Sequence, residues 1–373
     1  MERSKKRIRI GDERSRRLAF ALHGVSKQRI RAILAAAGDT CSADALYNST
    51  RSEAASLLVT ERMECSDGST FEWELFDPTL LVQHVLSKSE HLATVYARTM
   101  LEKPMPWHIV IGYDEFVPGN KLRIKNLRKS MVVAFNFLEL GQDVLEKDNT
   151  WFVPIVVRST KVETFNWSAG LRVFLNRLML HPLSPRIAGI PLTIRGVTRL
   201  LYATVSDIVT DGDGHKIGQE WNGASGLKNC FIHSNVFAKD SRMESGNIVT
   251  ITCHSPTRFM PTVTEDVYDQ ADLVLAGRRR VREGMMTNES FSKVQMATGL
   301  NVTERGLLAD VPLRRALDIP SVMVVDWMHT VFQDGVMSVE VYEMLEAAAA
   351  VGITRQRVHA YLKSWAFPCH LQE

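Results

Sequence analysis

Three short apolar runs, one amphipathic helix and a fourth apolar run follow one another between residues 107 and 205. The runs are Trp107–Tyr113, Met131–Phe137, Trp151–Val157 and Leu200–Val205, and the helix at 166–180 stands between the third and the fourth. Short apolar runs bounded by turn residues predict buried strands. Pro154 favours an edge position or a bulge for the third strand, because proline cannot donate a ladder hydrogen bond.

The order of these elements predicts a topology. Three consecutive strands, a helix and a further strand fit an antiparallel meander whose crossover helix returns the chain to a place beside the first strand. Such crossovers are right-handed, so we expect the fourth strand to run parallel to the first. This is the order of a ribonuclease-H-like sheet. We therefore predict an α/β fold with a ribonuclease-H-like mixed sheet, flanking helices and a Cys/His-containing insertion.

The sequence outside this core predicts further helices and one more strand of the sheet. We expect helices at Val25–Ala37, 77–103, Glu265–Glu283 and, separated by Gly352, two within 338–366, with strands at Asn247–Cys253 and Ser321–Val325. The predicted organisation is a basic leader and short helical or linker region at 1–70, a helical lead-in at 71–106, a core at 107–232, an insertion at 233–320 and a core return with C-terminal helices at 321–373.

Three of the predicted strands lead into an aspartate, namely Asp114, Asp207 and Asp326. Because neighbouring parallel strands end at the same edge of a sheet, we expect Asp114 and Asp207 to lie side by side. Carboxylates, phosphate oxygens and water are the ligands of Mg²⁺, and two such ions can clamp an in-line phosphoryl transfer. The alternative is that each aspartate caps the element that follows it.

A second group of residues has the chemistry of a zinc site. Cys230 and His233 lie three residues apart, and Cys253 and His254 follow about 20 residues later, so the two pairs can supply four tetrahedral ligands. Adjacent side chains of one strand point to opposite faces, however, so Cys253 and His254 do not easily bind one ion together. A buried free cysteine and a surface histidine explain the same residues. The five cysteines are odd in number and widely spread, which favours a reducing compartment.

Basic residues gather locally although the net charge is only +3. Eight Lys or Arg stand within the first 17 residues, where they fit nucleic-acid binding, a nuclear address or a solvated leader. Two further clusters are candidates for DNA backbone contacts: Lys121, Arg123, Lys125, Arg128 and Lys129, and Arg278, Arg279 and Arg280. The alternative is two solvated faces. The sequence has no apolar run of about 18 residues, so we expect no membrane span.

Three short segments, in this order, resemble the transposases of CACTA-type DNA elements and their fungal and protist relatives. They are Tyr113–Asn120 with Arg128 and Lys129; Ser206–Asp207 continuing through Gly223 and Gly226 to Cys230 and His233; and Asp326–His329 with Asp334–Val336. The resemblance spans about 107–336. It implies a nuclear nuclease and strand transferase that acts on DNA with Mg²⁺ or Mn²⁺ on two aspartates, here Asp114 and Asp207, and a third acid.

The sequence also departs from the family. His233 stands where the family often has Cys, and Asp334 replaces a Glu. The family usually places its third acid beyond a helical insertion, whereas 44 residues follow His329 here, and this tail offers Glu340, Glu343 and Glu346. We expect Asp326 or Asp334 as the nearest third acid, with His329 as an orienting residue. A truncated or domesticated copy fits these departures. Two other functions stay open: a non-catalytic DNA-binding protein, and an interaction module that forms homo-oligomers through the helices at 338–366.

Overall fold

The computed structural model describes residues 54–65, 67–116, 129–194, 196–223, 227–228, 233–234, 238–240, 249–251, 260–325 and 336–363. The helix expected at Val25–Ala37 lies outside these residues. Contacts within the chain define two units. The first runs to Ile111 and includes Glu115–Ser206, and the second consists of Gly112–Asp114 and the residues from Asp207 onward.

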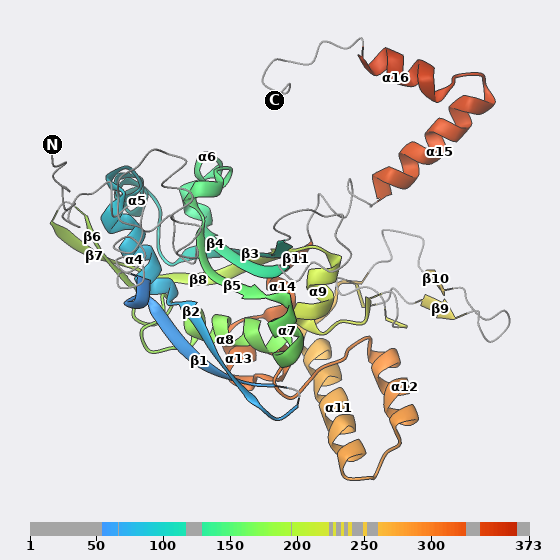
Figure 1. The fold of residues 1–373 in the computed structure, drawn as a ribbon, viewed down its shortest axis with the longest axis horizontal. Helices are drawn as coiled ribbons and strands as arrows, with labels where there is room; N and C mark the ends of the chain where they lie inside the picture. Colours follow the sequence, from blue (N-terminus) through green and yellow to red (C-terminus); the bar gives the residue numbers. More distant parts are fainter. Residues whose placement is uncertain are drawn as a thin grey trace, which may run out of the picture. The chain divides into compact units, whose positions relative to one another are not determined.

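A five-stranded mixed sheet is the largest sheet of the described chain, with the strand order β11-β8-β3-β4-β5 (Figure 1). Its members are β3 (Trp107–Phe116), β4 (Ser130–Phe137), β5 (Phe152–Arg158), β8 (Ala203–Thr210) and β11 (Met323–Val325). β4 and β5 are antiparallel, and β11 and β8 are parallel. The predicted adjacency of the first and fourth core strands is confirmed, as is the edge position of the strand that contains Pro154.

Strands β3 and β8 run in the same direction. At their starts the Trp107 N–H donates to the Tyr202 carbonyl oxygen at 2.8 Å. At their ends the Thr210 hydroxyl donates to the Tyr113 carbonyl oxygen at 3.1 Å. The start of β3 therefore lies beside the start of β8, and the end of β3 beside the end of β8. This is the parallel arrangement that the crossover predicted.

An aromatic cluster forms the core of the first unit. Its rings are Tyr96, Trp107, Phe135, Phe137, Phe152 and Phe174, each at most 2% exposed. Neighbouring ring centroids lie 5.2–6.5 Å apart, within the range of favourable stacked and edge-to-face pairs. The cluster holds the first residue of β3 against β4, β5 and the helices α5 (Glu90–Glu102) and α8 (Trp167–Met179).

The single helix expected from 77 to 103 is wrong, because the structure has two. Asp77 caps α4 (Pro78–Lys88) by accepting from the N–H groups of Thr79 and Leu80. Ser89 then takes an extended conformation and caps α5 by accepting from the Leu92 N–H. A serine hydroxyl that satisfies a new helix start stabilises the break. The helix expected at 166–180 is α8, and α7 (Ser159–Phe165) precedes it.

Two hairpins were not anticipated. β1 (Leu58–Glu64) lies in the region expected to be a linker and pairs with β2 (Thr70–Phe76), which lies almost wholly in the region expected to be a helical lead-in. Trp73 of β2 is buried, with its ring 5.7 Å from Phe165. β6 (Ile190–Ile194) pairs with β7 (Val197–Leu201). The expected strand Leu200–Val205 is therefore split between β7 and β8, and this part of the prediction is wrong.

The second unit contains Gly112–Asp114 of β3, Asp207–Thr210 of β8, β11 and most of the remaining helices. Its helices are α9 (Gly212–Gln219), α11 (Thr264–Arg282), α12 (Asn288–Thr298), α13 (Val311–Ala316), α14 (Ile319–Val322), α15 (Val336–Ala350) and α16 (Arg355–Lys363), and β9 (Ala238–Asp240) pairs with β10 (Val249–Ile251). Short helical turns in the chain are η1 (Leu138–Leu140), α6 (Gln142–Leu145), η2 (Asp148–Thr150) and η5 (Leu307–Ala309).

The helix expected at Glu265–Glu283 and the two helices around Gly352 are confirmed. Within the described residues, no helix has the length and apolar character needed to cross a bilayer.

Candidate functional site

The acid at the end of β8 is Asp211 and not Asp207. β8 continues through Ile208, which is fully buried, to Thr210, so Asp207 lies inside the strand. The Thr210 hydroxyl reaches the Tyr113 carbonyl, and this places Asp114 level with the end of β8. Asp207 is therefore three to four residues further back, roughly 10–13 Å at about 3.3 Å of rise per residue.

This strand register differs from the expectation that Asp114 and Asp207 lie side by side. Two carboxylates that share one Mg²⁺ must each bring an oxygen to about 2.1 Å from the ion, which the offset of Asp207 along the sheet does not allow. Asp114, exposed near the end of β3, and Asp211, half-buried directly after β8, stand instead at one edge of the sheet. Both belong to the second unit.

Asp211 is fixed by its role as the N-cap of α9. Its Oδ1 accepts from the Gly214 N–H at 2.6 Å, which satisfies one of the unpaired donors of the first helical turn. Gly214 allows this turn to lie against the strand end, because a Cβ there would fall 1.7 Å from the Thr210 Oγ1. The second oxygen of Asp211, Oδ2, is the one that could bind a cation.

Two buried aromatic side chains hold the start of α9 in place. The Tyr113 hydroxyl donates to the Gly214 carbonyl oxygen at 2.7 Å, and burial raises the pKa of Tyr113 well above its ordinary value, so the phenol remains a donor. The His215 Nε2 lies 3.2 Å from the Val324 carbonyl oxygen of β11. Burial lowers the pKa of His215, although the bond to Val324 and the charge of Asp211 oppose this. Because a carbonyl only accepts, Nε2 carries the proton of the neutral ring.

The third strand of this edge is β11. It pairs in parallel with β8, and Val325 lies level with Thr210. The next residue in the sequence is Asp326, which lies outside the described residues, as do His329 and Asp334. In the part of the chain that is described, no group of three or more His, Cys, Asp or Glu side chains could hold a metal ion. The described site thus consists of two acids.

The zinc prediction falls almost entirely on residues that are not described. Cys230, Cys253 and His254 lie outside them. His233 is half-buried and forms an isolated antiparallel bridge with Pro261. The convergence of these four residues therefore stays a prediction.

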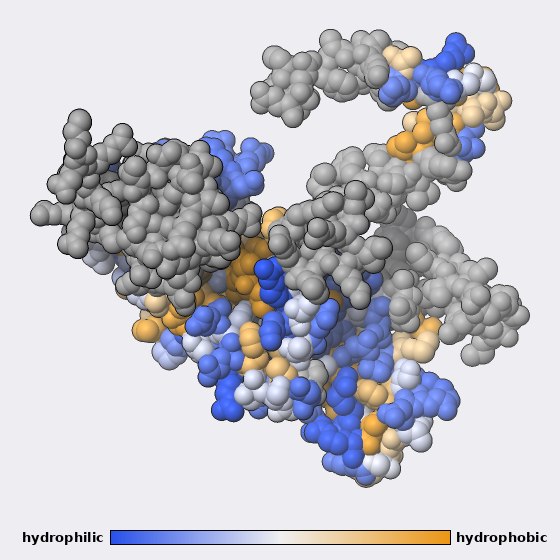
Figure 2. Space-filling view, in the orientation of Figure 1, coloured by the Kyte–Doolittle hydropathy of each residue, from blue (hydrophilic) through white to orange (hydrophobic). Residues whose placement is uncertain are grey.

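Some basic residues expected to contact DNA have internal roles. The Arg278 Nε donates to the Val302 carbonyl oxygen at 3.2 Å, and its guanidinium lies 5.3 Å from the centre of the Phe291 ring. Lys129 forms an ion pair with Glu115, in the first unit. Arg279 and Arg280 are exposed near the end of α11, and Figure 2 shows mainly hydrophilic side chains over α11 and α12. Lys121, Arg123, Lys125 and Arg128 lie outside the described residues.

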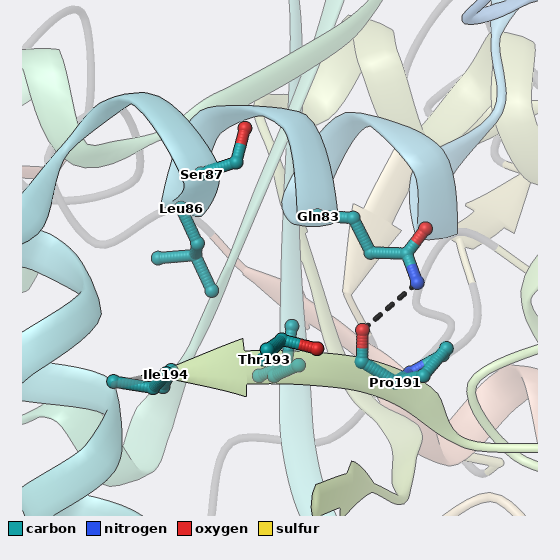
Figure 3. Close-up of a pocket in the computed structure, with 7 residues that line it drawn as sticks. Gln83, Leu86, Ser87, Pro191, Thr193 and Ile194 are labelled. Atoms are coloured by element: carbon teal, nitrogen blue, oxygen red, sulfur yellow. Dashed lines mark hydrogen bonds between the residues drawn. The ribbon is translucent and has the colours of Figure 1, made fainter. Parts of the chain in front are cut away.

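A small pocket in the first unit offers no comparable chemistry. It has a volume of about 250 Å³ and lies between α4 and β6, where the Gln83 side chain donates to the Pro191 carbonyl oxygen at 2.9 Å (Figure 3). Its other lining residues are Leu86, Ser87, Leu192, Thr193 and Ile194, so no acid, histidine, cysteine or lysine lines it.

No protein-family model matches the sequence, and no curated protein matches it.

Sequence reasoning missed Asp211, Tyr113 and His215. A signal for the first was present, because Asp211 opens the segment Asp-Gly-Asp-Gly-His, in which an aspartate before glycines marks a helix start. Tyr113 and His215 carried no signal, since their roles depend on contacts with Gly214 and Val324 that only the folded chain brings together.

Proposed function

We propose that this chain derives from a DNA transposase with a ribonuclease-H-like core, and that it acts on DNA by metal-dependent phosphodiester hydrolysis and strand transfer. The observation that carries the proposal is the common position of Asp114 and Asp211 at the carboxyl edge of β3 and β8. The strand order around β3 and the order of the family-like segments support it. Arg279 and Arg280 are candidates for contacts with the DNA backbone, in a nuclear setting.

Carboxylate side chains are suitable ligands for a hard divalent cation. Oxygen donors from one or two carboxylates, completed by phosphate oxygens and water, are the normal ligands of Mg²⁺, and Mn²⁺ accepts the same set. Asp114 and the Oδ2 of Asp211 would hold the ion, with Asp326 or Asp334 as the third acid. Such a cation, when bound, makes a water molecule more acidic and stabilises the charge on the leaving oxygen.

The protein's own residues supply the geometry. The cap on α9 uses Oδ1 of Asp211, and Oδ2 is the oxygen that would bind the cation. The bond from the Tyr113 hydroxyl to the Gly214 carbonyl oxygen joins β3 to α9. The bond from the Thr210 hydroxyl to the Tyr113 carbonyl oxygen joins the end of β8 to β3. A rigid edge of this kind positions ligands before substrate arrives, which is the main protein contribution in phosphoryl transfer.

The test compares three asparagine variants of the full chain. Asp114→Asn and Asp211→Asn should remove the rise in melting temperature caused by Mn²⁺ and should abolish nicking of supercoiled DNA. Asparagine is as good an N-cap as aspartate, so Asp211→Asn keeps α9 intact. Asp207→Asn is the matched control and should keep both properties. Loss of activity in Asp207→Asn with a normal Asp211→Asn would overturn the site, and a wild type without any Mn²⁺ response would overturn the function.

A non-catalytic DNA-binding protein is the second candidate. The observation that favours it is that the described residues contain no group of three or more His, Cys, Asp or Glu that could hold a metal ion. In that case the wild-type chain binds DNA in a salt-dependent manner and never nicks it, with either Mg²⁺ or Mn²⁺ present.

Zinc bound by Cys230, His233 and the pair Cys253 and His254 is a separate proposal, based on ligand type and spacing. Metal analysis of purified protein should find zinc, and Cys230→Ala should reduce both the zinc content and the melting temperature. Protein that contains no zinc, with an unchanged Cys230→Ala variant, would rule this site out.

A further inference from the structure

The pocket between α4 and β6 borders one edge of the β6–β7 hairpin. Leu86 and Ser87 of α4 line one side of the pocket, and residues 191–194 of β6 line the other (Figure 3). The hairpin is a sheet of two strands, so β6 has β7 on one edge and no other described strand on its second edge. What the pocket can bind therefore depends on the backbone groups that β6 directs towards this second edge.

The register of the hairpin gives the direction of those groups. Pro191 has no N–H, so it cannot exchange two ladder bonds with Leu200, and the two form a non-hydrogen-bonded pair. Pair types alternate along an antiparallel ladder, so Thr193 and Thr198 form a pair of the same kind. The Thr193 N–H and C=O therefore point away from β7, to the side on which Gln83 meets the Pro191 carbonyl. Within the described residues, neither group of Thr193 is bonded to another backbone group or side chain.

The side chains of α4 explain why this position stays open. Gln83 is long enough to donate to the Pro191 carbonyl oxygen at 2.9 Å. One helical turn later the residue is Ser87, whose hydroxyl donates to the His84 carbonyl oxygen of its own helix at 2.7 Å. In the described part of the chain, no side chain of α4 thus does for Thr193 what Gln83 does for Pro191.

We propose that this edge binds an extended peptide segment of a partner protein, which adds a short strand to β6 and places an aliphatic side chain in the pocket. One peptide residue would exchange backbone hydrogen bonds with Thr193, as happens when a peptide is added to an open sheet edge. The lining residues are uncharged, and Leu86, Leu192 and Ile194 provide apolar surface, which favours an aliphatic side chain over a charged one.

The size of the site supports a peptide over other occupants. Its volume of about 250 Å³ is below the usual range of small-molecule sites, about 300–1,000 Å³, so it suits a single side chain better than a whole cofactor. Gln83 occupies the edge at Pro191, and the hairpin turns after Ile194, so Thr193 is the open position between them. One open residue is too little for a ladder between two copies of β6.

The experiment follows the Ile, Leu and Val methyl groups of the full chain by NMR while a capped heptapeptide is added. The peptide alternates threonine with valine and has leucine at its centre. We expect saturable shifts at the methyl groups of Leu86, Leu192 and Ile194. Methylation of the central amide nitrogen of the peptide should weaken binding by about tenfold, because one backbone hydrogen bond is lost.

Two pairs of variants test the two sides of the site. Thr193→Pro removes the outward N–H without removing a ladder bond to β7 and should weaken binding by about tenfold, whereas Thr193→Val keeps the N–H and should bind as the wild type does. Ser87→Gln gives α4 a second side chain of the length that closes the edge at Pro191, and it should abolish the shifts. Lys88→Gln is its control, because this exposed neighbour does not line the pocket.

Unchanged methyl spectra of the wild type on addition of the leucine peptide would overturn the proposal, as would equal affinities of Thr193→Pro and Thr193→Val. If Thr193→Pro does not fold, Ser87→Gln and Lys88→Gln decide in the same way, and equal affinities of these two would overturn it. Light scattering of the chain alone tests the other occupant: a dimer that Ser87→Gln dissociates would assign the edge to a second copy. The measurements use neither metal nor DNA, so they do not depend on the proposed function.

Discussion

Replacing Gly214 with alanine tests how closely helix α9 lies against the end of β8. The added Cβ would fall 1.7 Å from the Thr210 Oγ1 and 2.9 Å from the Thr210 Cβ. Real Cβ atoms essentially never approach another heavy atom within 3.0 Å, so either the helix or the threonine must move. Thr210 cannot rotate away freely, because its hydroxyl is bonded to the Tyr113 carbonyl.

Three contributions determine the size of the effect, and one of them opposes the other two. Overpacking a buried contact costs about 1–3 kcal/mol. Alanine in a helix is favoured over glycine by about 0.5–1 kcal/mol, which acts in the other direction. The Asp211 cap and the Tyr113 bond both end on Gly214, so a displaced first turn also weakens them, at roughly 1 kcal/mol for each bond. We therefore expect a net loss of about 1–3 kcal/mol in the free energy of unfolding.

Urea denaturation followed by circular dichroism measures this loss, and the same helix provides the control. Gly212 has no atom within 4 Å of an added Cβ, so Gly212→Ala should be neutral or slightly stabilising. Thr210→Ala combined with Gly214→Ala should lose less stability than the two single variants together, because the clash with Oγ1 is gone. Stabilisation by Gly214→Ala comparable to that by Gly212→Ala would refute the close approach.

Three further predictions concern other parts of the chain. Burial raises the pKa of Tyr268 from 10.0 to about 12, so the unfolded chain releases this proton first; the free energy of unfolding should fall as the pH rises from 10 towards 12, and Tyr268→Phe should remove that part of the fall in an alkaline denaturation series. Phe137→Ala should cost about 3–5 kcal/mol in urea denaturation, because its ring is fully buried in the aromatic cluster, whereas Leu138→Ala, at a site 39% exposed, should change little. If the chain binds DNA as proposed, Arg279→Ala should reduce the slope of log K against log salt concentration by about one, without loss of stability. Arg278→Ala should lower the melting temperature, since that side chain bonds Val302 and covers Phe291.

Periodicity was a reliable guide where a strand is an unbroken apolar run, even when single side chains such as Val156 of β5 are exposed. Strands β3, β4 and β5 are apolar runs between turn residues, and their order was sufficient to place β8 beside β3. It failed where polar residues interrupt the run. The residues Ser206 and Asp207 interrupt the apolar run of β8, so the strand was predicted to end too early, and the acid at its end was missed.

The other failures have local physical causes. Ser89 divides a continuous amphipathic pattern because its hydroxyl offers the next helix a cap, which no apolar count detects. The β1–β2 hairpin has glutamates alternating with buried Trp73 and Leu75, and a charged composition concealed the period of two. The roles of Tyr113 and His215 were beyond prediction, because each depends on one backbone carbonyl far away in the sequence.

The position of β11 in the sheet has a consequence for synthesis on the ribosome. More than a hundred residues separate Thr210, the end of β8, from Met323, the start of β11. Because the ribosome adds about 5–20 residues per second, β8 is complete for about 6–20 s before its second neighbour in the sheet, β11, has been synthesised. During that interval β8 is an edge strand, with one row of N–H and C=O groups open to any other nascent chain. A charge within an edge strand discourages such pairing, and Asp207 supplies one in the middle of β8.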